Sequence, residues 1–190
     1  INGEEGMGKT SFALQFPKPI DCFSLYESGT EDLIILGEAD EKYVTDHQPE
    51  TYGELTVGVN RSEAKTIIID AWSGYQRLLF DDLINKLYNG DSEKFFDYFK
   101  GPRSDSPIYA NKFLNSLENK RKQGTHILII SHATEDTVKN PSGLDYTTNT
   151  IDSDKGIRDV LKKWSSNIIY MALDPGIERV TKSTKGIATE

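Results

Sequence analysis

The sequence predicts an α/β fold with a mainly parallel sheet and helices on both of its faces. Two observations lead to this prediction. Short β-branched runs alternate along the chain with longer stretches of helical spacing, which is the pattern of consecutive βαβ units. The 190 residues are 36% hydrophobic and 27% charged, which suits one globular domain with a buried core. We therefore expect residues 1–190 to form a single domain.

The strands are predicted from short apolar runs rich in β-branched residues. These runs cover residues 20–26, 66–69, 126–130 and 167–173. A further run at 177–181 is expected to pair with the last of them across a turn at 174–176. A glycine-rich motif begins at Gly3, and motifs of this kind normally follow a buried strand. We therefore also expect a first strand that is truncated at its N-terminal end.

The helices are predicted between these strands. The first covers residues 8–16 and is closed by the prolines that follow. Apolar residues at helical spacing predict helices around 78–87, 113–117 and 157–164. Residues 38–61 have no clear period, whereas residues 134–155 are polar and are predicted to form a long loop.

Composition narrows the classes of function. The net charge of −8 provides no overall positive field to attract nucleic acid, although a local basic loop remains compatible with it. The lone Cys22 excludes an internal disulfide and a cysteine-based zinc site, and its apolar neighbours indicate a buried thiol in a reducing, cytoplasmic setting. No apolar run approaches the roughly 18 residues of a membrane span, so we expect no membrane association.

Residues 3–10 match the phosphate-loop pattern of Gly, four residues, Gly, Lys and Ser or Thr. Glycines let the backbone bend around an anion, and the helix that follows adds the positive end of its dipole. We expect Lys9 to reach the β- and γ-phosphates and the Thr10 hydroxyl to bind Mg²⁺. The alternative is an ordinary glycine turn before a helix. The predicted nucleotide-binding residues are Gly3, Gly6, Met7, Gly8, Lys9, Thr10 and Ser11.

Two carboxylates are predicted at the edge of the sheet where ligands bind in parallel α/β folds. Asp70 ends a buried strand and is expected to hold the water shell of Mg²⁺ beside Thr10; the alternative is that it caps the following helix. Many P-loop ATPases have a catalytic Glu directly after this Asp, but here that position is Ala71. Glu27, which follows the strand at 20–26, is therefore the candidate base for the attacking water; the alternative is an exposed, strand-terminal Glu.

His132 follows the strand at 126–130 and is expected at the same edge. From there a polar side chain can contact the γ-phosphate and signal its loss to the adjoining loop. The alternative is a histidine that makes only local hydrogen bonds in the turn.

Taken in chain order, these features resemble the RecA-like P-loop ATPases. The similarity is closest to phage-encoded members of the recombination and single-strand-annealing type, in residues 16–20, Glu27, residues 66–70 and residues 131–133. The resemblance implies ATP and Mg²⁺ as cofactors, with Thr10 and Asp70 as metal residues. It implies catalytic roles for Lys9, for Glu27 as the base and for His132 as the sensor, although RecA itself has a glutamine at the sensor position.

The resemblance also implies partners. RecA-like proteins contact single-stranded DNA through loops and assemble as oligomers, which here points to loops 97–106 and 133–156, to a homo-oligomer, and to the cytoplasm of a bacterial host if the protein is phage-encoded. The cations and aromatic residues available for this in or beside the loops are Lys100, Arg103, Lys139, Tyr98, Phe99 and Tyr146. Lys155 and Arg158 are candidates for contacting a neighbouring subunit's γ-phosphate, or lie on a solvated helix face.

Two other functions remain open at this point. One is a nucleotide-gated interaction module in which ATP orders residues 134–155 for a protein partner, with slow or no hydrolysis. The other is a small-molecule kinase, which needs a basic lid over the transferred phosphoryl group. The acidic composition of residues 134–154 argues against such a lid.

Overall fold

The computed structural model describes residues 1–173, so the strand predicted at 177–181 lies outside the described residues. The strands are short and are distributed along the whole of this region. They are β1 (Asn2–Gly3), β2 (Ile20–Ser24), β3 (Val44–His47), β4 (Thr66–Asp70), β5 (His126–Ile129), β6 (Ser131–Val138), β7 (Tyr146–Ile151) and β8 (Tyr170–Met171).

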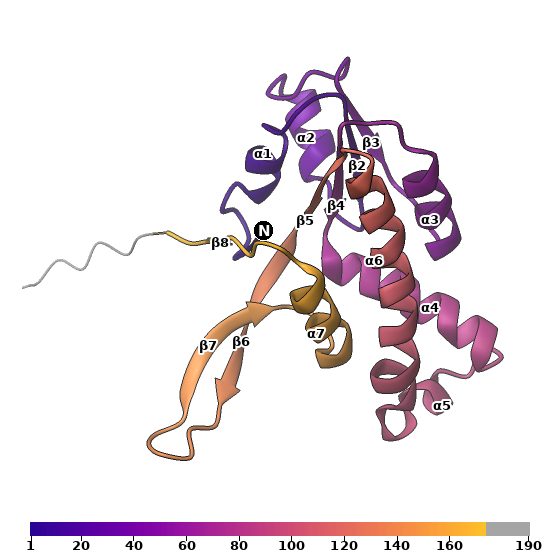
Figure 1. The fold of residues 1–190 in the computed structure, drawn as a ribbon, viewed down its shortest axis with the longest axis vertical. Coiled ribbons are helices and arrows are strands. Elements are labelled where there is room, and N and C mark those ends of the chain that lie inside the picture. The colour runs from indigo at the N-terminus through magenta and orange to yellow at the C-terminus, as the bar shows by residue number, and fades with distance from the viewer. Residues whose placement is uncertain (174–190) are drawn as a thin grey trace, which may run out of the picture.

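The helices lie between the strands, as the alternating pattern predicts (Figure 1). They are α1 (Lys9–Ala13), α2 (Gly29–Ile35), α3 (Tyr52–Arg61), α4 (Trp72–Leu87), α5 (Ser92–Phe96), the helical turns η1 (Asp97–Phe99) and η2 (Gly101–Asp105), α6 (Ser106–Lys122) and α7 (Lys155–Trp164). Among residues 1–173, no helix combines the length and the apolar character that a bilayer crossing requires.

The strands form two four-stranded sheets that are connected through β5 and β6. Their orders are β3-β2-β4-β5 and β7-β6-β1-β8, and every pairing is parallel except that of β6 with β7. Only Ile130 separates β5 from β6. Its N–H donates to the Ile69 carbonyl, while the next N–H, that of Ser131, donates to the Ile1 carbonyl. The strand therefore pairs with β4 first and with β1 afterwards, which joins the two sheets.

The core lies on both faces of the sheet because side chains alternate along each strand. In β4, Ile67 and Ile69 pack into a cluster with buried residues of α3, α4, α6 and α7. Ile68 points to the opposite face, where it packs in a cluster with Ala13 of α1. Figure 1 shows α1 and α2 on one side of β4 and the helices α3, α4 and α6 on the other. The predicted α/β fold with helices on both faces is confirmed.

Several predicted boundaries change. The helix expected at 8–16 is the shorter α1, and residues 38–61 resolve into β3 and α3. The strand expected at 20–26 ends at Ser24, because Tyr26 has a φ of 63°, which is incompatible with an extended strand. Within the strand expected at 167–173, only Tyr170 and Met171 pair with β1.

The prediction of a long loop over residues 134–155 is wrong, because β6 and β7 form an antiparallel hairpin there. Its register places Thr134 opposite Thr150 and Thr137 opposite Thr147. Threonine favours strands, but both faces of the outer hairpin are polar, so the sequence lacks the apolar alternation that reveals a half-buried strand. In Figure 1 the hairpin projects away from the helices. The loop predicted at 97–106 is also wrong, since η1 and η2 fill it with helical turns.

Candidate functional site

The turn between β1 and α1 has the backbone that its glycines predict. Gly6 and Gly8 have φ values of 73° and 74°, in the left-handed region that side chains with a Cβ rarely adopt. A Cβ would meet no atom within 4 Å at either position, so backbone conformation and not space calls for glycine. Gly8 is the N-cap residue of α1, and the loop therefore leads directly into the helix N-terminus. Free amides at such an N-terminus are suited to binding an anion.

Lys9 lies at the first turn of α1 and is only 6% exposed. Its Nζ donates hydrogen bonds to the carbonyl oxygens of Gly3 at 2.9 Å and Glu4 at 2.6 Å. Burial lowers the pKa of Lys9, while the carboxylates of Asp70, Glu27 and Glu5 act in the opposite direction. An anion at the mouth of the loop would favour the charged ammonium further.

Thr10 and Asp70 are joined by a hydrogen bond. The Thr10 hydroxyl donates to Asp70 Oδ2 at 2.8 Å, which links the start of α1 to the end of β4. The alternative role of Asp70 as a helix cap is excluded, because the N-cap of α4 is Ala71 and no side chain caps that helix. One hydroxyl and one carboxylate side by side fit Mg²⁺, which prefers oxygen ligands and keeps several waters.

Asp70 is a buried acid with few compensating contacts. It is 3% exposed, and burial raises its pKa; the Thr10 hydrogen bond acts in the opposite direction and the charge of Glu27 adds to the rise. Its ionised form therefore destabilises the fold. A buried carboxylate of this kind, lining a cavity, is a candidate for a functional site.

Glu27 and His132 meet across the same edge of the sheet. His132 Nε2 lies 2.8 Å from Glu27 Oε1, and the two side chains are 21% and 34% exposed. Glu27 lies between β2 and α2, two residues before α2 begins, and His132 is the second residue of β6. The other ring nitrogen of His132, Nδ1, is buried and has no hydrogen-bond partner among the described residues. The His132 ring is therefore held by Glu27 at Nε2, while its Nδ1 has no hydrogen-bond partner among these residues.

A cavity of about 430 Å³ brings the predicted residues together. Gly3 lies below it in β1 and does not line it; a Cβ at Gly3 would collide with the Met171 carbonyl of β8. The lining residues are Glu5, Gly6, Met7, Gly8, Lys9, Thr10, Ser11, Glu27, Ser28, Gly29, Asp32, Leu33, Asp70 and His132.

The sequence interpretation missed the contribution of α2 to this cavity. Ser28, Gly29, Asp32 and Leu33 line it, because α2 begins two residues after Glu27 and turns its first residues toward the phosphate loop. A signal was present. A helix that starts immediately after a strand-terminal site residue places its first turn at the same edge of the sheet.

The residues considered for DNA or neighbouring subunits do not line this cavity. Arg158 forms an ion pair with Asp136 of β6 at 3.0 Å, and Lys155 is exposed. Tyr98 is 92% exposed, and the Arg103 guanidinium lies over the Phe99 ring at 4.5 Å. Tyr98 and Lys155 are thus available on the surface, whereas the Arg158 side chain is only 13% exposed and is held by Asp136.

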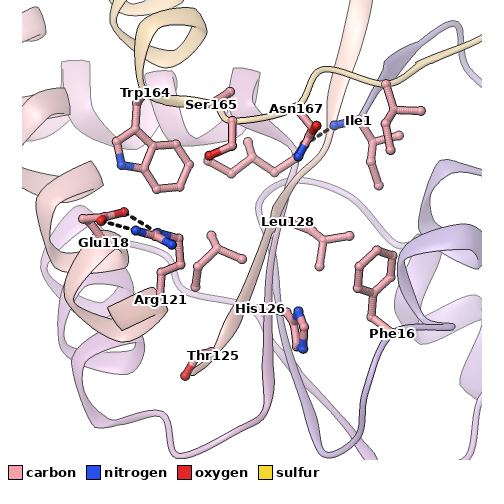
Figure 2. A pocket seen from close by; sticks show the side chains of 14 residues that line it. Ile1, Phe16, Glu118, Arg121, Thr125, His126, Leu128, Trp164, Ser165 and Asn167 are labelled. Carbon is pink, nitrogen blue, oxygen red and sulfur yellow. Dashed lines mark hydrogen bonds and ion pairs between the residues drawn. The ribbon is translucent and has the colours of Figure 1, made fainter. Parts of the chain in front are cut away.

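A second cavity, of about 440 Å³, runs along β5 and shares no lining residue with the first (Figure 2). His126, the first residue of β5, lines it together with Phe16 and Trp164. Its charged lining residues Glu118 and Arg121 pair with each other at 2.7 Å, as the dashed lines show. None of the predicted site residues lines this second cavity. This cavity is therefore separate from the candidate site.

Comparison with known proteins adds one match. The family model described as "AAA domain" matches residues 1–189, which is nearly the whole chain. A search of curated proteins finds no match.

Asp70→Asn is expected to raise the stability of the protein at pH 7 in the absence of divalent ions. Because the folded-state pKa of Asp70 is raised, the folded protein binds this proton more tightly than the unfolded chain does. The wild type therefore gains stability as the pH falls toward 4, and the advantage of Asp70→Asn shrinks. Urea unfolding at pH 7, 5.5 and 4 measures this.

The matched control is Glu5→Gln, which neutralises an exposed carboxylate in the same cavity. It should leave the free energy of unfolding within about 0.5 kcal/mol. A pH-independent or negative effect of Asp70→Asn would contradict the assignment of Asp70 as a strained, buried carboxylate.

Proposed function

We propose, from the premise that this chain belongs to the AAA domain family, that it binds ATP with Mg²⁺ and hydrolyses it to ADP and phosphate. Membership of that family makes the chain an ATPase-like P-loop domain, a class associated with nucleotide binding and hydrolysis. The observation that carries the proposal is the convergence of Lys9, Thr10, Asp70, Glu27 and His132 on one cavity beside the phosphate loop.

The phosphate loop and Lys9 bind the triphosphate in this proposal. The N–H groups at the start of α1 donate to phosphate oxygens, because no residue of the preceding turn accepts from them within the helix. Lys9 Nζ exchanges the carbonyls of Gly3 and Glu4 for phosphate oxygens. A charge-assisted hydrogen bond to phosphate is stronger than one to a neutral carbonyl, so this exchange favours the bound state.

Thr10 and Asp70 hold the metal ion, Thr10 through its hydroxyl and Asp70 through the water shell. The ion, when bound, neutralises charge that develops on the β- and γ-phosphate oxygens. Asp70 is held for this task by its place at the end of the fully buried strand β4.

Glu27 accepts a proton from the attacking water, and His132 orients Glu27. The hydrogen bond of 2.8 Å between Nε2 and Oε1 directs one carboxylate oxygen toward His132 and leaves the other for the water. His132 also begins the hairpin, so a change in its contacts with the γ-phosphate would reach β6 directly.

The finer function that we propose is recombination or single-strand annealing of the RecA-like, phage-encoded type, with residues 1–190 as one domain and a homo-oligomer in the cytoplasm of a bacterial host as the working form. The projecting hairpin and the exposed Tyr98 and Tyr146 support contact with single-stranded DNA, since exposed aromatic rings stack on bases. Lys100, Arg103 and Lys139 supply nearby positive charge.

A nucleotide-gated interaction module is the second candidate. It is favoured by one observation, the direct link between Glu27 and the first residues of the hairpin through His132. In this alternative, bound ATP sets the orientation of β6 and β7 for a protein partner, and hydrolysis is slow or absent.

Glu27→Gln separates these candidates. If Glu27 is the base, phosphate release should fall by about a hundredfold or more while ATP binding is retained, because the amide cannot accept the proton. Steady-state phosphate release and calorimetric ATP binding measure the two effects. The matched control is Glu31→Gln, an exposed carboxylate on α2, which should turn over at a near-wild-type rate. Equal turnover in Glu27→Gln and the wild type would exclude Glu27 as the base.

Single-stranded DNA should stimulate phosphate release severalfold at low salt, and the stimulation should fall as salt rises. Rates measured with and without single-stranded DNA at several salt concentrations test this. Turnover that does not respond to DNA at any salt would remove recombination and annealing. It would leave the interaction module, or another ATPase of the same fold.

A further inference from the structure

The base of the hairpin is held at two points by the first two turns of α4. On one side, the backbone N–H of Trp72 donates to the Ile130 carbonyl at 2.8 Å, directly before β6 begins. On the other side, Oε1 of Gln76 accepts two hydrogen bonds beyond the end of β7. The donors are the Ser153 hydroxyl at 2.9 Å and the Asp154 N–H at 2.6 Å.

His132 is close to both of these contacts, since it lies two residues after Ile130 and is hydrogen-bonded to the residue before Ser153. The Asp152 N–H donates to the His132 carbonyl at 2.9 Å, and Asp152 directly precedes the residues that Gln76 holds. His132 is therefore connected to Gln76 by one backbone hydrogen bond and a single step along the chain. Since α4 begins two residues after Asp70, the same helix is connected to both the metal residue and the histidine.

Gln76 also holds α7 through the same contact. Asp154 is the N-cap of α7, and its Oδ1 accepts from the Gly156 N–H at 2.9 Å. Farther along this helix, Arg158 pairs with Asp136 at 3.0 Å and Lys162 Nζ donates to the Thr150 hydroxyl at 2.7 Å. The hairpin and α7 are thus joined to each other, and the side chain of Gln76 joins them to α4.

The chemistry at Gln76 calls for an acceptor. Both hydrogen bonds end on the same carbonyl oxygen, so a carboxylate oxygen in its place would accept them equally well. An apolar side chain would leave the Asp154 N–H and the Ser153 hydroxyl without this partner. None of the functions assigned above explains such a doubly used acceptor, because Gln76 does not line the nucleotide cavity.

We propose that Gln76 is a positioning residue that holds His132 against Glu27 and makes the hairpin respond to the nucleotide. The inference rests on the proposed function, since it gives His132 the task of orienting Glu27 and sensing the γ-phosphate. With Gln76 in place, a change at His132 moves the hairpin relative to a fixed base on α4. Without it, Ser153 and Asp154 lose this contact with α4, so a change at His132 shifts residues 152–154 as well and no longer sets the position of the hairpin relative to α4.

The test compares Gln76→Ala and Gln76→Glu with the wild type in the full chain. The control is Asp81→Ala, at an exposed position on the same helix. Phosphate release gives kcat and KM for ATP, and hydrogen exchange of residues 133–151 is followed with and without ATP–Mg²⁺. Thermal unfolding confirms that each variant is folded.

Gln76→Ala should lower kcat by about tenfold to a hundredfold, the size expected when a catalytic group is misplaced by about an ångström. Its KM should stay within about threefold of wild type, since the phosphate loop is untouched. The difference in hairpin exchange between the ATP-bound and free protein should disappear. Gln76→Glu and Asp81→Ala should retain both the rate and the difference.

Several results would overturn the inference. They are an unchanged kcat and nucleotide response in Gln76→Ala, equal damage in Gln76→Glu, and hairpin exchange in Gln76→Ala that is faster by the same factor with and without ATP, so that the difference between the two states is kept, which marks a purely structural role. A wild type that binds ATP but releases no phosphate contradicts the proposed hydrolysis instead, and hydrogen exchange then decides the inference alone. A wild-type hairpin that does not respond to ATP overturns it as well.

Discussion

The hydrogen bond from the Thr10 hydroxyl to the Asp70 carboxylate joins residues that are 60 positions apart, and the site depends on it. It forms because β1 and β4 run parallel, with β5 and β6 as the line between them, so that both end at the same edge of the sheet. Glu27 follows β2 at this edge, and His132 lies at the start of β6, which continues the line of β5. Parallel pairing in the sheet therefore brings residues that are far apart in the sequence to the lining of one cavity.

The buried charges of Lys9 and Asp70 in this cavity lower the stability of the folded protein. Lys9 and Asp70 are both almost fully buried, and burial disfavours the charged form of each. Their compensating contacts are few: two carbonyls for Lys9 and one hydroxyl for Asp70. A polyphosphate would add negative charge beside Lys9 and a divalent cation would add positive charge beside Asp70, which is the physical reason to expect both to bind together. The AAA domain match over residues 1–189 agrees with this interpretation.

The sequence predicted the sheet and the position of the site for the same reason. Residues 66–70 form an uninterrupted buried run, and such a run implies a strand covered on both faces, with its final carboxylate at the ligand edge. The hairpin could not be predicted in this way, because β6 and β7 are stabilised by pairing with each other and by contacts to α7 and Gln76, and not by an apolar face. The role of Gln76 depends on hydrogen bonds to residues more than 70 positions away, which no local pattern encodes, whereas the place of α2 could have been inferred from its start two residues after Glu27.

The most direct test of the account is calorimetric titration of the protein with ATP–Mg²⁺, because every proposed role requires the triphosphate in the loop that precedes α1. We predict binding by the wild type that weakens by about a hundredfold in Lys9→Ala, as expected for the loss of charge-assisted hydrogen bonds to phosphate. Lys18→Ala, which removes an exposed lysine outside the site, should bind like the wild type. Wild-type protein without affinity for ATP–Mg²⁺, or Lys9→Ala with unchanged affinity, would contradict the account.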